Sequence, residues 1–165
     1  MRAPASCLAG VLLLALAVLG GAACGPTVDL AKSLEVTDVA SGWHDAGVVD
    51  GKNKLVPAIA FKLKNNSDQT LSSLQVNALF RRVNEPDEWG SGYVKVTGSE
   101  GLPAGQSTPP LVINSQLGYT GVEARADLLK HRAFVDAKVE IFAKYGSTQW
   151  AKLGEFPITR QLEIH

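Results

Sequence analysis

The two cysteines, Cys7 and Cys24, are the side chains of this sequence with the most distinctive chemistry. A thiol can pair in a disulfide, act as a nucleophile, or carry a covalently attached group. Cys24 ends the stretch LLLALAVLGGAAC, in which an apolar run gives way to small residues, and Gly25 and Pro26 follow it. The nature of that preceding stretch therefore decides which role Cys24 takes.

The first 23 residues have the organisation of a secretory signal peptide. Arg2 provides a positive charge, an apolar segment extends from Leu8 to Leu19, and small residues follow it. The segment is much shorter than the roughly 20 apolar residues of a membrane-spanning helix, and no second such run occurs. We therefore expect residues 1–23 to be removed on export. Cys7 would leave with them, so no disulfide is expected.

The order of positive residue, apolar run, small residues and cysteine resembles the signal of bacterial lipoproteins. Ala22 and Ala23 match that signal, whereas Gly21 stands where it usually has leucine. The resemblance implies that Cys24 carries a diacylglyceryl group and becomes the N-terminus of a protein held at the cell envelope, facing the periplasm. Gly25, in place of aspartate, implies the outer membrane rather than the inner one.

Two interpretations of the N-terminal segment remain open. In the first, acyl chains on Cys24 anchor the protein, because each buried methylene contributes about 0.8 kcal/mol and two or more chains hold stably. Residues 24–32 would then be a short tether. In the second, a plain secretory signal is cleaved after Ala23 and leaves a soluble secreted or periplasmic protein. In both, residues 33–162 form one domain.

The charge and motif content argue against nucleic-acid binding and against catalysis. The chain has 16 Lys+Arg and 16 Asp+Glu and lacks the positive patch of a nucleic-acid binder. It has no Gly-x-Ser-x-Gly and no phosphate-binding glycine loop, and its histidines lack zinc-ligand spacing. Two acidic loops are the best metal candidates, but neither has the pattern of a calcium loop: HDAGVVDGKN with Asp45 and Asp50, and NEPDE with Glu85, Asp87 and Glu88. We expect a non-enzymatic protein without a metal or other cofactor.

From residue 33 onward, apolar and polar residues alternate with a period of two, which indicates β-strands. The clearest strands are Ile59–Asn65, Leu74–Phe80 and Val135–Tyr145. Shorter or weaker ones are SLEVTDV, SGYVKVTG, TPPLVINS and WAKLGEFPI. The sequence therefore predicts an all-β, immunoglobulin-like β-sandwich of about seven antiparallel strands.

The connections between these strands are rich in turn-forming residues. They predict antiparallel hairpins at Asn65–Thr70, Asn84–Gly90 and Tyr145–Gln149. The segment TGVEARADLLKHR departs from the strand pattern, because Thr120 and Glu123 have the spacing of a helix capping box. We expect a short helix or an ordered crossover near residues 121–132.

The stretch FKLKNNSDQTLSSLQVNALFRRV, followed by LPAGQSTPPLVI, resembles bacterial immunoglobulin-like domains of the FxLYD type. The resemblance covers about residues 58–113, and RRVNEPDE stands where the family has a Tyr-Asp pair. It implies the sandwich fold and a cell-envelope location. It implies no reaction and no functional residues.

Two aromatic residues are candidates for contacting a partner. Trp89 falls in a predicted hairpin tip, and Phe142 falls on the charged face of a predicted strand. An exposed aromatic at either place can be a binding hot spot, or it can pack under a neighbouring loop.

The leading hypothesis is a lipid-anchored, non-enzymatic cell-envelope protein that docks a membrane or periplasmic protein partner through a strand edge or the Asn84–Gly90 tip. The alternative is a small-ligand or glycan-binding protein with a loop-lined cleft near Trp43, Trp89 or Trp150.

Overall fold

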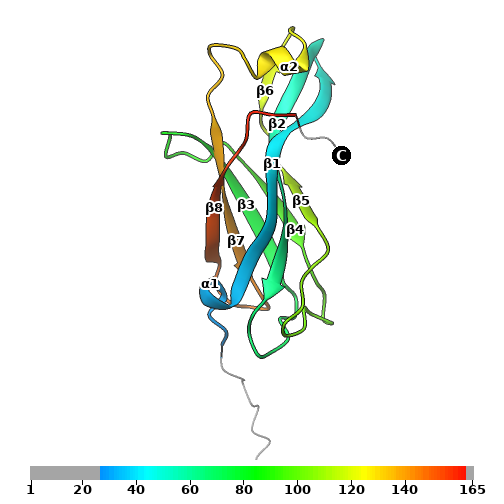
Figure 1. The fold of residues 1–165 in the computed structure, drawn as a ribbon, viewed down its shortest axis with the longest axis vertical. Helices are drawn as coiled ribbons and strands as arrows, with labels where there is room; N and C mark the ends of the chain where they lie inside the picture. The colour runs from blue at the N-terminus through cyan, green and yellow to red at the C-terminus, as the bar shows by residue number, and fades with distance from the viewer. Residues whose placement is uncertain (1–26, 163–165) are drawn as a thin grey trace, which may run out of the picture.

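The computed structural model describes residues 27–162, which form a β-sandwich of two antiparallel sheets (Figure 1). One sheet has the order β1-β2-β5, with β6 pairing the far part of β2, and the other has the order β4-β3-β7-β8. The strands are β1 (Leu34–Val49), β2 (Lys52–Asn65), β3 (Gln75–Arg82), β4 (Gly90–Lys95), β5 (Leu111–Asn114), β6 (Tyr119–Gly121), β7 (Ala137–Lys144) and β8 (Ala151–Pro157). The predicted all-β sandwich is confirmed, with eight strands in place of about seven.

The longest element is the hairpin of β1 and β2, which includes the first of the two acidic loops. The two strands pair from Leu34 and Asn65 up to Val49 and Lys52. Asp50 and Gly51 form the turn, with φ values of 50° and 72°. Positive φ at both residues is the requirement of a type I′ two-residue hairpin turn, for which Asp-Gly is a favoured sequence. The acidic segment is therefore strand and turn rather than a long loop.

The connection between β2 and β3 is not a hairpin, which corrects the prediction for Asn65–Thr70. β2 and β3 lie in different sheets, so this segment crosses from one layer of the sandwich to the other. The buried side chain of Asn65 organises the crossing, because its amide donates to the carbonyls of Gln69 and Leu102 at 2.9 Å each. Its Oδ1 accepts from the backbone N–H of Ser67 at 3.0 Å. The hairpins after β3 and β7 are confirmed.

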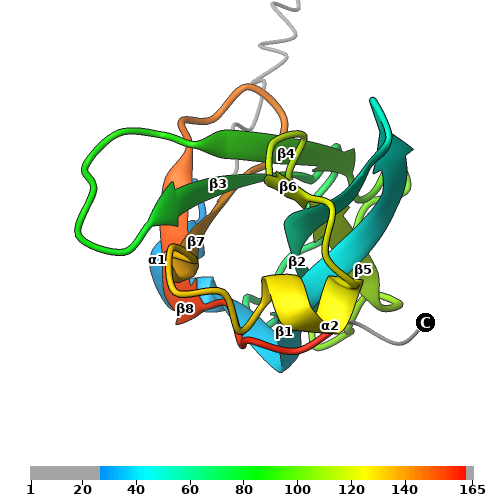
Figure 2. The same ribbon diagram turned by 90° about the horizontal axis from the view of Figure 1, so that it is seen from above.

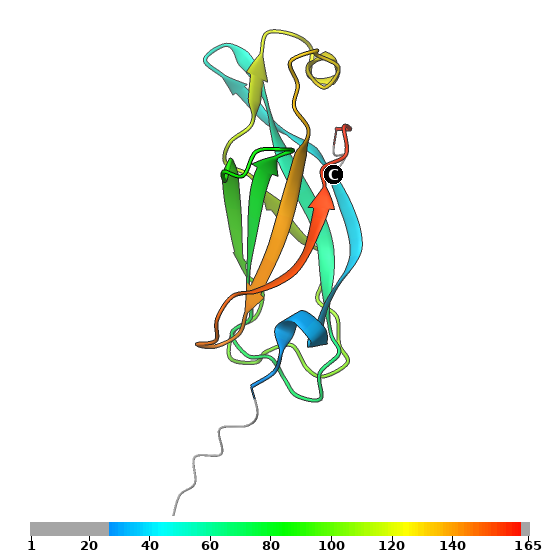
Figure 3. The ribbon, with the colours of Figure 1, turned by 90° about the vertical axis from the view of Figure 1, so that its left-hand side faces the viewer.

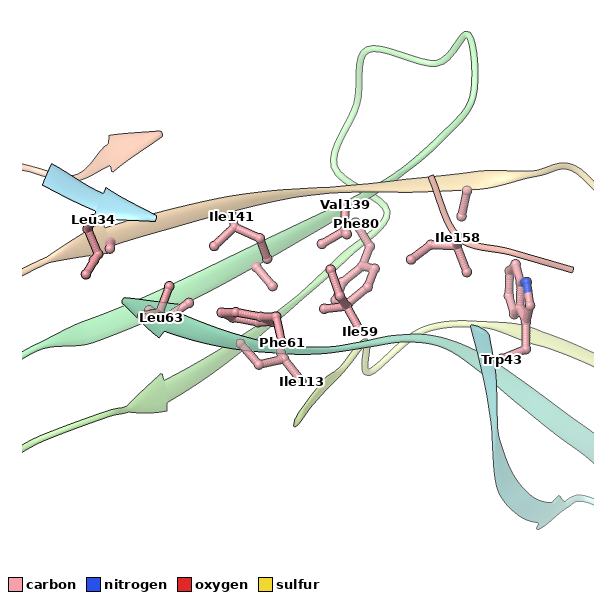
Figure 4. Close-up of a cluster of buried hydrophobic side chains, with 14 of the residues drawn as sticks. Leu34, Trp43, Ile59, Phe61, Leu63, Phe80, Ile113, Val139, Ile141 and Ile158 are labelled. Carbon is pink, nitrogen blue, oxygen red and sulfur yellow. The ribbon is translucent and has the colours of Figure 1, made fainter. Parts of the chain in front are cut away.

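The core lies between the sheets and is built from the alternate residues that the period of two selects. β7 shows the alternation most plainly, since every second residue is buried from Ala137 to Ala143. Figure 4 shows side chains from both sheets meeting in this layer, with Leu34 at one end and Trp43 at the other. Trp43, Ile59, Leu63, Phe80 and Ile141 are fully buried.

Both long edges of the sandwich are partly covered. On one side β4 approaches β5, and a Cβ on Gly92 would lie 2.3 Å from the Ile113 side chain. Glycine is therefore required there for the sheets to meet. On the other side the Trp43 backbone N–H donates to the carbonyl of Gln161 at 2.8 Å, so the C-terminal segment covers β1. Figure 2 shows the two sheets surrounding the interior.

The two helices are single turns that mark opposite ends of the sandwich. α1 (Leu30–Ser33) lies where the chain enters the domain, which we call the entry end, and α2 (Arg125–Leu128) lies at the other, the distal end (Figures 1 and 3). Leu30 is buried, so part of the predicted tether packs on the domain. α2 confirms a helix within residues 121–132, but its N-cap is Ala124 and has no side-chain cap. The Thr120–Glu123 capping box is therefore wrong.

Within residues 27–162, no helix has the length and apolar character needed to cross a membrane.

Candidate functional site

Within residues 27–162, the acidic residues considered as metal candidates do not assemble into a cluster of metal ligands. No three His, Cys, Asp or Glu side chains there come together as metal ligands would. Asp45 forms an ion pair with Arg125 of α2, and its Oδ1 accepts from the backbone N–H of Gly47 at 2.9 Å. Hydrogen bonding from Arg125 is the main cause that lowers the pKa of Asp45. Asp45 therefore fastens α2 to β1.

Trp89 belongs to an aromatic cluster in the interior of the distal end. Its ring centroid lies 6.1 Å from Trp43 and 5.0 Å from Tyr119, and it is half-buried. Phe134 completes the cluster at 4.6 Å from both Trp43 and Tyr119. The guanidinium of Arg82 lies 4.9 Å from the Trp89 ring centroid. Trp89 thus packs against its own domain rather than standing free as a binding hot spot.

Phe142 lies on the outer face of the β4-β3-β7-β8 sheet, which faces the viewer in Figure 3. The register places Tyr93, Asn77, Phe142 and Lys152 in one row across the four strands. Tyr93 is 59% exposed, and Phe142, on the other side of Asn77 in the same row, is half-buried. Trp150, which immediately precedes β8, is 41% exposed. The Lys144 ammonium lies 4.9 Å from the centroid of its ring. We call Tyr93, Phe142 and Trp150 the outer-face aromatics.

A network of charged side chains borders the outer-face aromatics. Glu140, only 14% exposed, accepts from Arg81 at 2.9 Å and from Lys152 at 2.5 Å. Glu155 accepts from Lys138 and Lys152 at 3.2 Å each. The hydrogen bond from Lys152, followed by that from Arg81, lowers the pKa of Glu140. These charged groups pair with one another on the same face as Phe142, with Lys152 in the row of Phe142 itself.

We expect Glu140→Gln to lower the free energy of unfolding by about 1 kcal/mol at pH 7, because two charge-assisted hydrogen bonds weaken. The pKa of Glu140 is lower in the folded state, so its contribution is present above the unfolded value and is lost as pH falls through the folded one. Urea unfolding from pH 7 to pH 3 should show the two proteins converging in acid. Glu88→Gln, in the exposed 83–89 connection, is the control, and an equal loss there would contradict the assignment.

A cleft of about 270 Å³ opens at the distal end. It lies between β6 and the segment that follows α2, and Tyr119, Thr120, Glu123, Leu128, His131, Ala133 and Phe134 line it. Tyr119 and Phe134 also belong to the aromatic cluster, so the cleft is adjacent to the interior site of Trp43 and Trp89. It lies far from the end at which the chain enters the domain.

Cys24 lies outside the described residues, as does the whole of the predicted signal peptide. The chain matches no known family model and no curated protein.

The sequence pattern located Phe142 on the outer face but did not place Tyr93 in the same row. The two residues are 49 positions apart, and only the pairing of β3 with both β4 and β7 brings them into one row. The alternative hypothesis placed a cleft near Trp43, Trp89 or Trp150, but the residues that line this one were missed, because they come from a short strand, a one-turn helix and a loop. A signal that could have pointed to the row is the alternation of β4, which predicts Tyr93 on an exposed face.

Proposed function

We propose that this protein is a lipid-anchored, non-enzymatic binding module of the cell envelope that docks a protein partner on the outer face of its β4-β3-β7-β8 sheet. The lipid on Cys24 would hold it at the membrane, facing the periplasm and at the outer membrane. The observation that carries the proposal is the row containing Tyr93 and Phe142, in which an exposed and a half-buried aromatic side chain lie on the outer face of one sheet.

The composition of this face suits a protein interface. Tyrosine and tryptophan are enriched among the residues that dominate binding energy, and arginine is enriched at interfaces with them. Tyr93 is held in place by the hydrogen bond from its hydroxyl to Gln75 Oε1 at 3.0 Å. A ring that is already positioned loses little conformational freedom on binding. The outer-face aromatics therefore have both the chemistry and the pre-organisation of an anchor.

A strand edge is a weaker candidate for docking. β1 has bulges after Thr37 and Asp45, which interrupt the regular row of backbone groups that an added strand would need. β4 lies against β5 through its glycines, and the C-terminal segment covers part of β1. The face of the sheet, rather than its edge, is the open surface.

The experiment is site-specific photo-crosslinking in intact cells, with the crosslinking amino acid at position 93 and, as the matched control, at position 112. Val112 is 47% exposed on β5, in the opposite sheet. We expect a discrete adduct from position 93 that position 112 does not give. Adding Phe142→Ala should reduce the yield of that adduct about tenfold, which corresponds to about 1.4 kcal/mol of binding energy.

Circular dichroism of the purified Phe142→Ala protein controls for loss of fold. Equal adducts from positions 93 and 112, or an adduct that is insensitive to Phe142→Ala in a folded protein, would overturn the proposal.

A further inference from the structure

The distal cleft has a wall made of two aromatic rings with a buried polar group behind it. The ring centroids of Tyr119 and Phe134 lie 4.6 Å apart with 40° between the ring planes, and both line the cleft. The Tyr119 hydroxyl donates to the carbonyl of Val135 at 3.2 Å and accepts from its backbone N–H at 3.3 Å. These bonds fix the Tyr119 ring, so the wall is formed before any ligand arrives.

Trp43 supplies the buried polar group. Its side chain is fully buried against the wall, with ring centroids 5.6 Å from Tyr119 and 4.6 Å from Phe134. Its Nε1–H has no hydrogen-bond partner within residues 27–162. Figure 4 shows the indole nitrogen on the side of the ring away from the other labelled core residues. Trp43 does not itself line the cleft, so its indole N–H is a reporter of a ligand packing on the other side of the wall rather than a contact for that ligand.

The rest of the lining offers both donors and acceptors. The exposed carboxylate of Glu123 accepts hydrogen bonds, and the hydroxyl of Thr120 can do either. Nδ1 of His131 accepts from the backbone N–H of Ala133 at 3.2 Å, which leaves Nε2 as the donor of the neutral ring. A ligand matched to this set has an apolar face for the aromatic wall and groups that both donate and accept at its rim.

From these features we infer that the cleft binds a single neutral sugar ring, such as the end of a glycan. The C–H face of a sugar ring packs on aromatic side chains, and its hydroxyl groups both donate and accept. The volume of about 270 Å³ is at the small end for ligand sites, which suits one ring rather than a longer ligand. The carboxylate of Glu123 disfavours an anionic ligand. This site is separate from the outer-face aromatics, so the inference does not depend on the proposed protein docking.

Gly121 gives a variant that alters the cleft with little change elsewhere. A Cβ at this position would lie 2.3 Å from Leu128 Cδ2 and 2.5 Å from Glu123 Oε2. Both atoms are ends of flexible side chains that line the cleft, so Gly121→Ala should displace them rather than unfold the domain. Another glycine, Gly105, cannot serve as the control for Gly121→Ala. Its φ of 73° is a left-handed conformation that alanine adopts only with strain. Val112→Ala, on an exposed face of β5, is the matched control.

The test is titration of the purified, ¹⁵N-labelled domain with N-acetylglucosamine, glucose, glycerol and tetramethylammonium, followed by two-dimensional NMR. We expect saturable shifts of the Trp43 indole N–H with one or both sugars, and a dissociation constant on the order of 1 to 10 mM. Glycerol, which has hydroxyl groups but no ring face, should give no saturable shift. Gly121→Ala and Glu123→Gln should each weaken sugar binding about tenfold or more, while Val112→Ala should leave it unchanged.

Other outcomes would overturn the inference. Saturable shifts with tetramethylammonium but neither sugar would identify a cation site, in which the aromatic rings and Glu123 hold positive charge. An absence of saturable shifts with both sugars up to 100-fold above the expected range would also reject it, as would sugar binding that Gly121→Ala leaves unchanged in a protein with a wild-type amide spectrum. If the sugar-binding outcome holds, a disaccharide ending in the same ring should bind through that ring, with the same residues shifted.

Discussion

Substitution of Trp43 by alanine is expected to lower the free energy of unfolding by about 3 to 5 kcal/mol, one of the largest effects of a single change in this domain. Domains of this kind have about 5 to 15 kcal/mol of stability in total. The melting temperature should therefore fall by about 10 to 20 °C. Urea unfolding and differential scanning calorimetry of the purified domain measure both quantities.

The size of the effect follows from where Trp43 lies. Its side chain has no exposed surface and contacts the rings of Trp89, Tyr119 and Phe134, which come from three other segments of the chain. Its backbone N–H also donates a hydrogen bond to the carbonyl of Gln161, which attaches the C-terminal segment to β1. Removing the ring leaves a cavity at the point where β1, β6 and the segment after α2 meet. The cavity cannot close without moving all of them.

Trp43→Phe is the matched control, because it keeps an aromatic ring and removes the unpaired Nε1–H. The smaller ring leaves some cavity, but loss of a buried, unpaired donor offsets part of that cost. We expect a loss of no more than about 2 kcal/mol. Equal losses for the alanine and phenylalanine variants would contradict this account, since they would mean that the volume of the ring contributes nothing.

The second large effect is expected at Cys24. If the proposed lipid anchor is correct, Cys24→Ser should move the protein from the membrane fraction to the soluble fraction almost completely, because a serine hydroxyl is not the acceptor of the diacylglyceryl group. Acyl chains contribute about 0.8 kcal/mol for each buried methylene, so loss of two or more chains removes nearly all membrane affinity. Fractionation of cells, followed by immunoblotting, measures the change.

Cys7→Ser is the natural control for this experiment. Both cysteines lie near the N-terminus, but Cys7 precedes the apolar run of the signal and would be removed with it. Its replacement should leave the membrane fraction unchanged. An unmodified Cys24 in the mass spectrum of the N-terminal peptide, or a Cys24→Ser protein that stays at the membrane, would reject the anchor and favour the plain secretory signal.

Local sequence patterns predicted most of the strands and the hairpins after β3 and β7, but not the crossing between the sheets or the short strand β6. The alternation in Val135–Tyr145 predicted one buried face and one polar face, and β7 has both. The turn residues of Asn65–Thr70 predicted a hairpin, yet this segment crosses between the sheets. Asparagine and serine satisfy backbone groups equally well in a hairpin turn and in a crossing. Asn65 stabilises the crossing, because its side-chain amide donates a hydrogen bond to the carbonyl of Leu102, 37 residues further along the chain.

The helix near residues 121–132 shows a similar limit. The spacing of Thr120 and Glu123 fits a capping box, but Thr120 pairs with Lys54 as part of β6. A single turn such as α2 gains little from its own hydrogen bonds, because helix nucleation is unfavourable in a short segment. Contact with β2 and β6, together with the ion pair from Arg125 to Asp45 on β1, therefore sets where the helix begins.

Three features could be predicted from the sequence: the β class, the alternation of buried and exposed positions, and the location of Phe142 on the outward face of its strand. Each depends on residues that are close together in the chain. Only the folded structure shows that the half-buried Trp89 packs against the core, that Tyr93 lies in the row of Phe142, and that Trp43 lies behind the wall of a cleft. These are juxtapositions of residues tens of positions apart. They arise from strand pairing and sheet packing, whose energy comes from contacts that no local pattern contains.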